Sequence, residues 1–589
     1  MMPAMSDIDL RWMLLNFVQN IYATQLFYRL SVVLFFSIFM TFALAPAFHE
    51  YTAARYKRAI SLSDGLFIGS IFLLLLFSRW PGFLIKTPNP DEAQFISCAT
   101  RLLKDPVYWR GADAATSGPL NIYILTLPAF FGLKIEYASA KAVELVLMST
   151  AVFFLYFSLS RLYGKALSRI AVAPVVTKIA FLLDFDFIHY SSEEVSVVLL
   201  GASLFLLCAY YRRPADDKCG LIFLSGLLLG LLPYAKLQSM PMAFLLFCAF
   251  LHLLWVKKVS PEDYRKKSSY LILGALVVSL IVLVCVAQFN LTKYFWVSYV
   301  SSNLFYSGLN KSFLDKIWAW NVMVNRIQIN RLLSMALLGL LAVSSVYIVT
   351  KIHNKPRFVR DKNPRFPLIL YSFLYPTTCL MAIVISGHLF FHYLLYLITP
   401  AGFLLGVLLG EIHRRADGVY INQKRLKRVA ATLVVSGILF FCIGTLYKRI
   451  SSDNPYLNIA HELRNNYIDP AAKVILKHAH PGDLLAVWGW APELYVDTGL
   501  TPATRAANCY WQGYPLDNQS FILETYMNDL KKSKPRLFVD AVAPNRFFRY
   551  SDRAKTGYET KKPLKDFVLM NYKLVDEVNG VRIFQRNDT

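Results

Sequence analysis

The chain has 589 residues, of which 56% are hydrophobic and 15% aromatic, and its formal net charge is +24 at pH 7. A soluble domain is about half apolar, so this excess indicates a membrane protein. The positive charge does not indicate nucleic-acid binding, because Lys and Arg fall mostly in short loops between apolar runs and no nucleic-acid-binding motif occurs.

Long apolar runs predict the membrane-spanning helices. A helix needs about 20 apolar residues to cross the bilayer core, and we expect a polytopic α-helical membrane protein with about 11 to 13 spans. Arg29 interrupts the first run, which leaves open whether that run spans or lies at the interface. The predicted spans are residues 26–48, 64–80, 138–159, 170–187, 195–211, 221–234, 241–256, 270–287, 332–349, 367–385, 393–409 and 429–446.

The charges of the loops predict the orientation of these spans. Loops rich in Lys and Arg alternate with loops that carry few of them or are long, and the basic loops are expected in the cytoplasm. We therefore predict a transmembrane domain of residues 1–447 and an extracytoplasmic domain of residues 448–589. The loops expected on the outer side are residues 81–137, 188–194, 235–240, 290–331 and 387–392.

The C-terminal segment reads as a small soluble α/β domain. Helical patterns cover residues 458–479 and 521–532, and apolar runs at 484–490 and 535–542 predict strands. Residues 572–586 contain Asn-Gly between two apolar runs, which is the signature of a tight β-hairpin.

The first long outer loop carries two adjacent acids, Asp91 and Glu92, directly after Pro90. Proline followed by acids is typical of a helix start, where acids stabilise the helix dipole. The same pair suits a catalytic base or metal ligand at the membrane surface, because a helix start also fixes the direction of a carboxylate. Residues 93–105 have apolar positions at helical spacing, which predicts an interfacial helix.

Several outer segments together resemble the C-type glycosyltransferase superfamily, with the lipid A aminoarabinose transferases and protein O-mannosyltransferases as the most similar members. The resemblance rests on the order of motifs in agreement with the topology. They are "NPDEAQFISCATRLLKDPVYW" from Asn89, "TSGPLNIY" from Thr116, "GLLPYAKLQSMPMA" from Gly230, "GHLFFHYLLYLITP" from Gly387 and "GDLLAVWGWAPELYVDTGLTPATR" from Gly482.

The resemblance implies a single-sugar transferase that uses a polyprenyl-phosphate donor, such as an undecaprenyl phosphate sugar, and inverts the anomeric centre. The acceptor would be a hydroxyl or phosphate of lipid A or lipopolysaccharide, another glycan or a protein, at the outer face of a bacterial inner membrane. Asp91 is then the expected base, and Glu92 orients it or binds acceptor. The sugar and the acceptor stay open.

The leaving phosphate needs cations or fixed donors. Lys236, His392 and Tyr393 are expected there by resemblance, and Arg110 is a weaker candidate; interfacial snorkelling of Lys236 is the alternative. His388 lies four residues before His392, so a helix would put both imidazoles on one face. Arg331 is a further cationic candidate for the phosphate.

Further acids lie in and beside the second outer loop, "LLDFDFIHYSSEE" from Leu182. Acids at a membrane edge are costly and therefore indicate function. Glu193 or Glu194, or Asp113 in the first loop, is expected as a second acid that binds acceptor or metal. Asp184 and Asp186 are both left open between interface acids and functional acids, and a divalent cation, Mg²⁺ or Mn²⁺, is neither required nor excluded.

Three other functions fit parts of the sequence. A transporter or lipid flippase would also have many spans and intramembrane acids. An O-antigen ligase-like enzyme would move a whole glycan, and a receptor or scaffold would fit if the acids only cap helices. Substitution of Asp91 by Asn separates these classes, because only an enzyme loses turnover while it keeps its fold.

Overall fold

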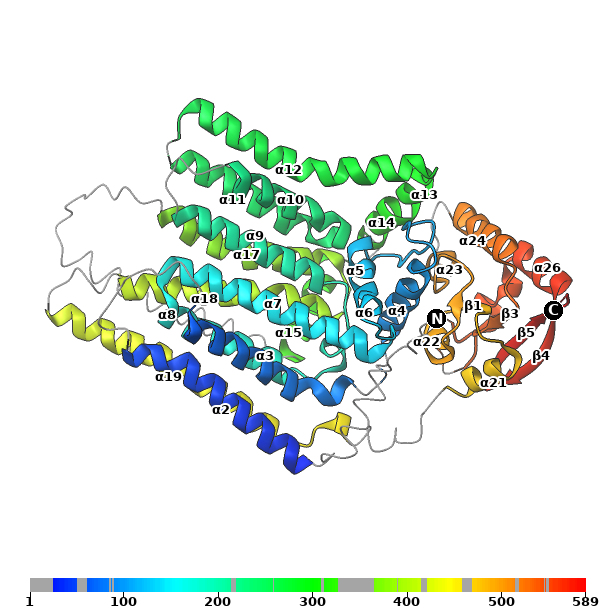
Figure 1. The fold of residues 1–589 in the computed structure, drawn as a ribbon, viewed down its shortest axis with the longest axis horizontal. Helices are drawn as coiled ribbons and strands as arrows, with labels where there is room; N and C mark the ends of the chain where they lie inside the picture. Colours follow the sequence, from blue (N-terminus) through cyan, green and yellow to red (C-terminus); the bar gives the residue numbers. More distant parts are fainter. Residues whose placement is uncertain are drawn as a thin grey trace, which may run out of the picture.

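A computed structural model gives the structure of the chain. It describes residues 25–49, 61–83, 86, 89–212, 219–257, 259–308, 312–326, 365–388, 390–414, 421–457, 469–513, 519–544, 546 and 550–588. The described chain is a bundle of long helices with a smaller sheet domain at one end (Figure 1).

Nine of the described helices are long and apolar enough to cross a membrane. Every predicted span overlaps a described helix except residues 332–349, which lie outside the described residues, as does Arg331. The bundle helices are α2 (Gln25–His49), α3 (Leu62–Phe83), α7 (Tyr137–Tyr163), α8 (Lys165–Phe181), α9 (Glu194–Arg212), α10 (Cys219–Ala235), α11 (Met240–Val256), α12 (Pro261–Gln288), α17 (Arg365–Ser386), α18 (Leu395–Arg414) and α19 (Ile421–Ile450).

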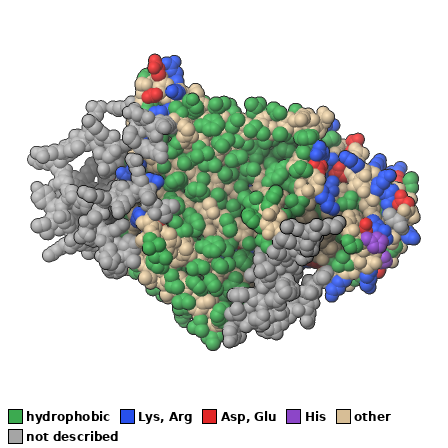
Figure 2. All heavy atoms as spheres, viewed as in Figure 1, with side chains coloured by type: hydrophobic (Ala, Val, Ile, Leu, Met, Phe, Trp, Pro, Cys, Tyr) green, Lys and Arg blue, Asp and Glu red, His purple; other side chains and the backbone are tan. Residues whose placement is uncertain are grey.

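The surface of the bundle agrees with a membrane protein. Figure 2 shows a broad hydrophobic face over the helices, with charged side chains gathered at its two ends. Arg29, which interrupts the first apolar run, lies near the start of α2, and its Nη2 is 2.8 Å from Asp453 Oδ1. Its charge is therefore paired near one end of the helix, and α2 counts among the membrane-length helices.

The C-terminal domain contains a five-stranded sheet in the order β2-β1-β3-β5-β4. The predicted hairpin is confirmed: Asn579 and Gly580 have φ of 51° and 79°, as a tight turn with two left-handed residues requires. The strands are β1 (Leu484–Trp488), β2 (Thr501–Pro502), β3 (Leu537–Asp540), β4 (Tyr572–Val578) and β5 (Val581–Arg586), and the main helices are α21 (Pro470–His478), α22 (Glu493–Thr498), α24 (Gln519–Ser533) and α26 (Lys562–Asn571).

The first outer loop forms a helical layer between the bundle and the sheet domain (Figure 1). It contains α4 (Pro90–Leu102), α5 (Pro119–Tyr123) and α6 (Leu127–Phe130). Helix α4 was expected at the membrane interface, but most of its residues are buried, because it packs against α5, α7, α22 and β2. The sheet domain, not lipid, therefore covers its apolar positions.

Helices α10 and α12 approach closely through glycines, which determines where the outer end of α10 lies. A Cβ on Gly226 would be 2.1 Å from the carbonyl oxygen of Leu271, and one on Gly230 would be 2.3 Å from that of Ala275. Small residues at such spacing let two membrane helices pack backbone to backbone. Because Lys236 directly follows α10, this contact also contributes to its position.

We expect Gly226→Ala to lower the free energy of unfolding by about 1–3 kcal/mol, because the added methyl group must push α12 away. The matched control is Gly220→Ala on the same helix, where nothing lies within 4 Å of the added carbon. Denaturant unfolding in detergent measures both variants. Equal stabilities of the two would show that α10 and α12 do not pack as described.

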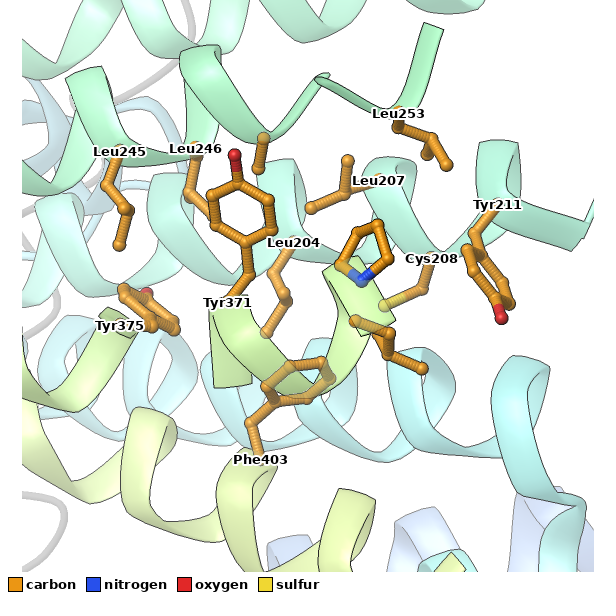
Figure 3. Close-up of a pocket in the computed structure, with 13 residues that line it drawn as sticks. Leu204, Leu207, Cys208, Tyr211, Leu245, Leu246, Leu253, Tyr371, Tyr375 and Phe403 are labelled. Carbon is orange, nitrogen blue, oxygen red and sulfur yellow. The ribbon is translucent and has the colours of Figure 1, made fainter. Parts of the chain in front are cut away.

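An apolar cavity lies among α9, α11, α17 and α18, at the end of the bundle opposite α4. Every residue drawn in Figure 3 is apolar or aromatic, among them Leu207, Leu246, Tyr371 and Phe403. Such a wall can contact hydrocarbon, and its titratable groups are the Cys208 thiol and the hydroxyls of Tyr211, Tyr371 and Tyr375. The predicted site residues lie at the other end of the bundle.

Candidate active site

The first acid of the outer loop is held by the start of α4. Asn89 caps the helix: its side-chain oxygen accepts the backbone N–H of Asp91 at 3.0 Å, and Pro90 is the first helical residue. The Asn89 amide nitrogen is also 3.4 Å from Asp186 Oδ1, in the second outer loop. The predicted helix start is thus confirmed, and its cap joins two outer loops.

Lys236 and Glu193 form a buried ion pair between the ends of α10 and α9. The Lys236 ammonium donates to Glu193 Oε1 and, at 2.7 Å, to the Ser192 hydroxyl. It also lies 4.6 Å from the centre of the Tyr393 ring, a cation–π contact. Glu193 is fully buried and Lys236 is 6% exposed, so this lysine does not extend into solvent by snorkelling.

His392 completes this charged cluster. It lies in a short 3-10 turn, Phe391–Leu394, before α18, and its Nε2 is 3.9 Å from Glu193 Oε2. The ring is 4% exposed, and its Nδ1 has no hydrogen-bond partner among the described residues. A buried polar atom without a partner calls for a bound water or ligand.

Asp186 is one of the two acids whose role the sequence left open. Its Oδ2 accepts the backbone N–H of Phe391 at 3.2 Å, next to His392, while Oδ1 faces Asn89. His189, in the same loop, has its ring centre 5.9 Å from that of His392. The second outer loop therefore contributes an acid and an imidazole that the sequence gave no reason to choose over their neighbours.

The electrostatics distinguish the two acids of the cluster. Desolvation raises the pKa of Asp91 and outweighs the lowering by the charges of His392 and Lys236, while Glu193 and Asp186 add smaller rises. Burial acts to raise the pKa of Glu193 too, but Lys236 and His392 together bring it below its ordinary value. Asp91 keeps partial exposure. Glu193 thus serves as a counter-ion, and Asp91 is the accessible, more basic carboxylate.

Glu92 points into the protein, unlike its neighbour. It is fully buried, its Oε1 accepts the backbone N–H of Tyr190 at 3.0 Å, and its Oε2 is 3.7 Å from Nζ of the fully buried Lys141. This arrangement ties α4, α7 and the second outer loop together. The expected contact of Glu92 with acceptor does not agree with this burial; its geometry suits the positioning of Asp91.

We expect Glu92→Gln to lower the free energy of unfolding by about 3–5 kcal/mol, because it leaves the Lys141 charge buried without its counter-ion. Adding Lys141→Met should recover most of that loss together with normal turnover. Thermal unfolding and activity in detergent check both, with exposed Glu262→Gln as the control. A stable but inactive Glu92→Gln protein would instead give Glu92 a chemical role.

Three other predicted site residues have partners other than Lys236. Glu194 is buried at the start of α9, where it accepts the Ser191 N–H at 3.0 Å. Asp113 accepts the Tyr294 hydroxyl at 2.7 Å and the Ala115 N–H at 2.9 Å, beside the sheet domain. Arg110 makes a two-pronged ion pair with Asp105. The structure does not bring Arg110 or Asp113 to the cluster.

The geometry gives no support to a metal site. No group of three or more His, Cys, Asp or Glu in the described part of the chain has metal-binding geometry. Glu193 is paired with Lys236, and Asp186 accepts a hydrogen bond from the backbone N–H of Phe391. His388 and His392 do not share a helix face, because the His388 ring stacks on Tyr306 at 4.0 Å outside any helix.

A cavity of about 180 Å³ opens beside Lys236 and Tyr393. It lies between the start of α11, α14 (Ser302–Gly308) and the end of α17. Its wall combines polar and apolar side chains. The polar members include Thr116, Gln238, Asn303 and Ser386, and the apolar members include Leu237, Pro241, Leu304 and Ile385. Such a cavity suits a ligand with a charged head and a hydrocarbon tail.

No family profile matches the chain, and no curated protein matches its sequence. Its fold is similar to two crystal structures of ArnT from Cupriavidus metallidurans, a C-type glycosyltransferase. The structure with undecaprenyl phosphate has 11% identity, a TM-score of 0.51, and coverage of 88% of this chain and 97% of that chain. For the apo structure the values are 13%, 0.50, 89% and 98%.

The apo oligosaccharyltransferase of Archaeoglobus fulgidus is less similar, with 12% identity, a TM-score of 0.42, and coverage of 80% of this chain and 69% of that chain. That likeness carries no weight here. The ArnT structures show that the described chain has the C-type glycosyltransferase fold of a multi-span membrane protein, as the order of its outer motifs predicts.

Proposed function

We propose that the chain is a membrane glycosyltransferase that moves a single sugar from a polyprenyl-phosphate donor to an acceptor hydroxyl or phosphate. The observation that carries the proposal is the meeting of Asp91, Glu193, Lys236 and His392 beside an amphipathic cavity at one end of a hydrophobic bundle. The shared fold with ArnT, solved with undecaprenyl phosphate, supports this donor class.

The donor phosphate would bind beside Lys236. The ammonium supplies a fixed positive charge, and the unpartnered Nδ1 of His392 can donate one further hydrogen bond. The first isoprene units would contact Leu237, Leu304 and Ile385 along the cavity wall. The sugar, which is attached to the phosphate, would lie at the end of the cavity beside Lys236.

The reaction we propose is a single displacement at the anomeric carbon. The acceptor oxygen attacks C1 of the sugar while Asp91 takes its proton, and the bond between C1 and the phosphate oxygen breaks. Polyprenyl phosphate leaves with the bonding electrons, and Lys236 stabilises the charge that develops on it. One bond forms as the other breaks on the opposite face, so the anomeric configuration inverts.

We place the reaction on the outer, periplasmic side of a bacterial inner membrane. The alternation of basic loops supports this side, and Figure 1 has α4 and the sheet domain at the same end of the bundle. Lipid A, lipopolysaccharide, other glycans and proteins all present suitable acceptors there. Asp91, Asp186 and Glu193 gather at one end of the bundle, whereas transporters bind their substrates near the middle of the membrane, which favours an enzyme over a transporter.

Mass spectrometry of outer lipids, glycans and glycoproteins tests this function in cells. Cells with the wild-type protein should carry an acceptor heavier by one sugar residue, and cells with Asp91→Asn should lack it at equal protein abundance. If Asp91→Asn cells keep the modified acceptor, the protein acts as a transporter or scaffold and not as the transferase.

A further inference from the structure

Asn121, in the short helix α5, joins three outer segments through one side chain. It is fully buried. Its amide nitrogen lies 2.7 Å from the carbonyl oxygen of Ala235, 2.9 Å from that of Ser192 and 2.9 Å from the Ser117 hydroxyl. The backbone carbonyl oxygen of Asn121 accepts the Tyr190 hydroxyl at 2.7 Å. The first outer loop is thus hydrogen-bonded to the second outer loop and to the turn after α10.

The two carbonyls that Asn121 holds belong to residues directly before the buried ion pair. Ala235 precedes Lys236, and Ser192 precedes Glu193. The Ser192 hydroxyl also accepts a hydrogen bond from the Lys236 ammonium. One amide group therefore fixes the backbone on both sides of the contact between Lys236 and Glu193.

The backbone beside Asn121 reinforces this contact. The Gly118 N–H donates to the same Ala235 carbonyl at 2.9 Å. A Cβ on Gly118 would lie 2.2 Å from the Tyr234 carbonyl oxygen, so only glycine allows the loop to come this close. The motif "TSGPLNIY" thus packs the first outer loop against the end of α10, a role that its sequence alone did not indicate.

We propose that Asn121 is a positioning residue that holds the Lys236 ammonium where it can bind the donor phosphate. The inference rests on the proposed function, in which Lys236 binds that phosphate. A primary amide is suited to this task, because its two N–H groups satisfy two buried carbonyls at once. Without it the carbonyls lose these donors and the turn can shift, and a displacement of about 1 Å at such a site can cost about 100-fold in activity.

The test measures the affinity of purified protein in nanodiscs for undecaprenyl phosphate, the expected product. Asn121→Ala should weaken this affinity about 10- to 100-fold. The affinity of Asn121→Ser, which keeps one donor, should lie between those of Asn121→Ala and the wild type. Asn121→Ser replaces Asn121→Ala in the test if Asn121→Ala does not fold. The control is Asn508→Ala, another buried asparagine, which bonds Gln94 at 2.7 Å between α4 and the sheet domain. It should leave the affinity within about twofold, since its side chain does not touch the Lys236 turn.

A double-mutant comparison separates positioning from general destabilisation. In a protein with Lys236→Met and Glu193→Gln, adding Asn121→Ala should weaken undecaprenyl phosphate binding no further. Full additivity, or an unchanged affinity of Asn121→Ala alone, would overturn the role of Asn121. If the Lys236→Met and Glu193→Gln protein binds as tightly as the wild type, the proposed phosphate site itself is wrong.

Discussion

Asp91→Asn is expected to lower the turnover of the purified protein by about 100- to 10,000-fold, the usual contribution of a general base. Asparagine keeps the shape of the side chain and leaves the helix cap at Asn89 in place. It cannot take the proton from the acceptor hydroxyl. Binding of undecaprenyl phosphate and the melting temperature should change little, because Asp91 is partly exposed and the described contacts of Lys236 do not include it.

The matched control is Asp105→Asn, in the same outer loop, where the carboxylate pairs with Arg110 away from the cluster. That variant should keep turnover within a few-fold of the wild type. Transfer of the sugar from an undecaprenyl phosphate donor, followed as released undecaprenyl phosphate, measures both proteins. Equal losses in the two variants would mean that Asp91 matters for the fold of the loop and not for proton transfer.

The pH dependence follows from the same carboxylate. Its pKa is raised, and the base acts only when it is deprotonated, so turnover should rise with pH through that pKa. The acid limb of the pH–rate profile should therefore lie above the range in which an ordinary aspartate titrates, about pH 4. This limb should disappear from the residual activity of Asp91→Asn.

Lys236→Met should have two separate effects. It leaves Glu193 buried without its cation, which is expected to lower the free energy of unfolding by about 3–5 kcal/mol. It also removes a charged hydrogen bond to the phosphate, worth about 1.5–3 kcal/mol, or about 10- to 150-fold in affinity for undecaprenyl phosphate. Thermal unfolding and lipid binding in nanodiscs report the two effects.

Adding Glu193→Gln to Lys236→Met separates these effects. Most of the stability should return, because no unpaired charge stays buried, while the affinity for undecaprenyl phosphate should stay low. Glu193→Gln alone should leave the lysine charge available and bind the phosphate at least as well as the wild type. Recovery of both stability and affinity in the double variant would show that Lys236 is structural only.

The membrane helices and the β-hairpin could be predicted because their signals are local. A run of about 20 apolar residues has few alternatives to a span, and Asn579-Gly580 adopts the left-handed turn that these residues favour. The interfacial position of α4 was wrong for a long-range reason. Its apolar face fits lipid and protein equally well, and the sheet domain that covers it lies several hundred residues later in the chain.

The site could be predicted only where a charge stood out against an apolar background, as with Lys236 and Asp91. Only the family resemblance assigned the base to Asp91 rather than Glu92, because adjacent helical residues face about 100° apart and the sequence does not fix the rotation of α4. Asn121 and Asp186 could not be found either, since their partners come from other loops. Polar loop residues of these types usually serve only turns and caps.

Photo-crosslinking with a light-activated polyprenyl phosphate in nanodiscs tests the central claim most directly, because it asks where the lipid phosphate binds. The predicted result is labelling of the cavity wall at Leu237, Leu304 or Tyr306, prevented by excess undecaprenyl phosphate and lost in the protein with Lys236→Met and Glu193→Gln. Labelling confined to the opposite cavity around Leu207 and Leu246, or unchanged in that variant, would contradict the account.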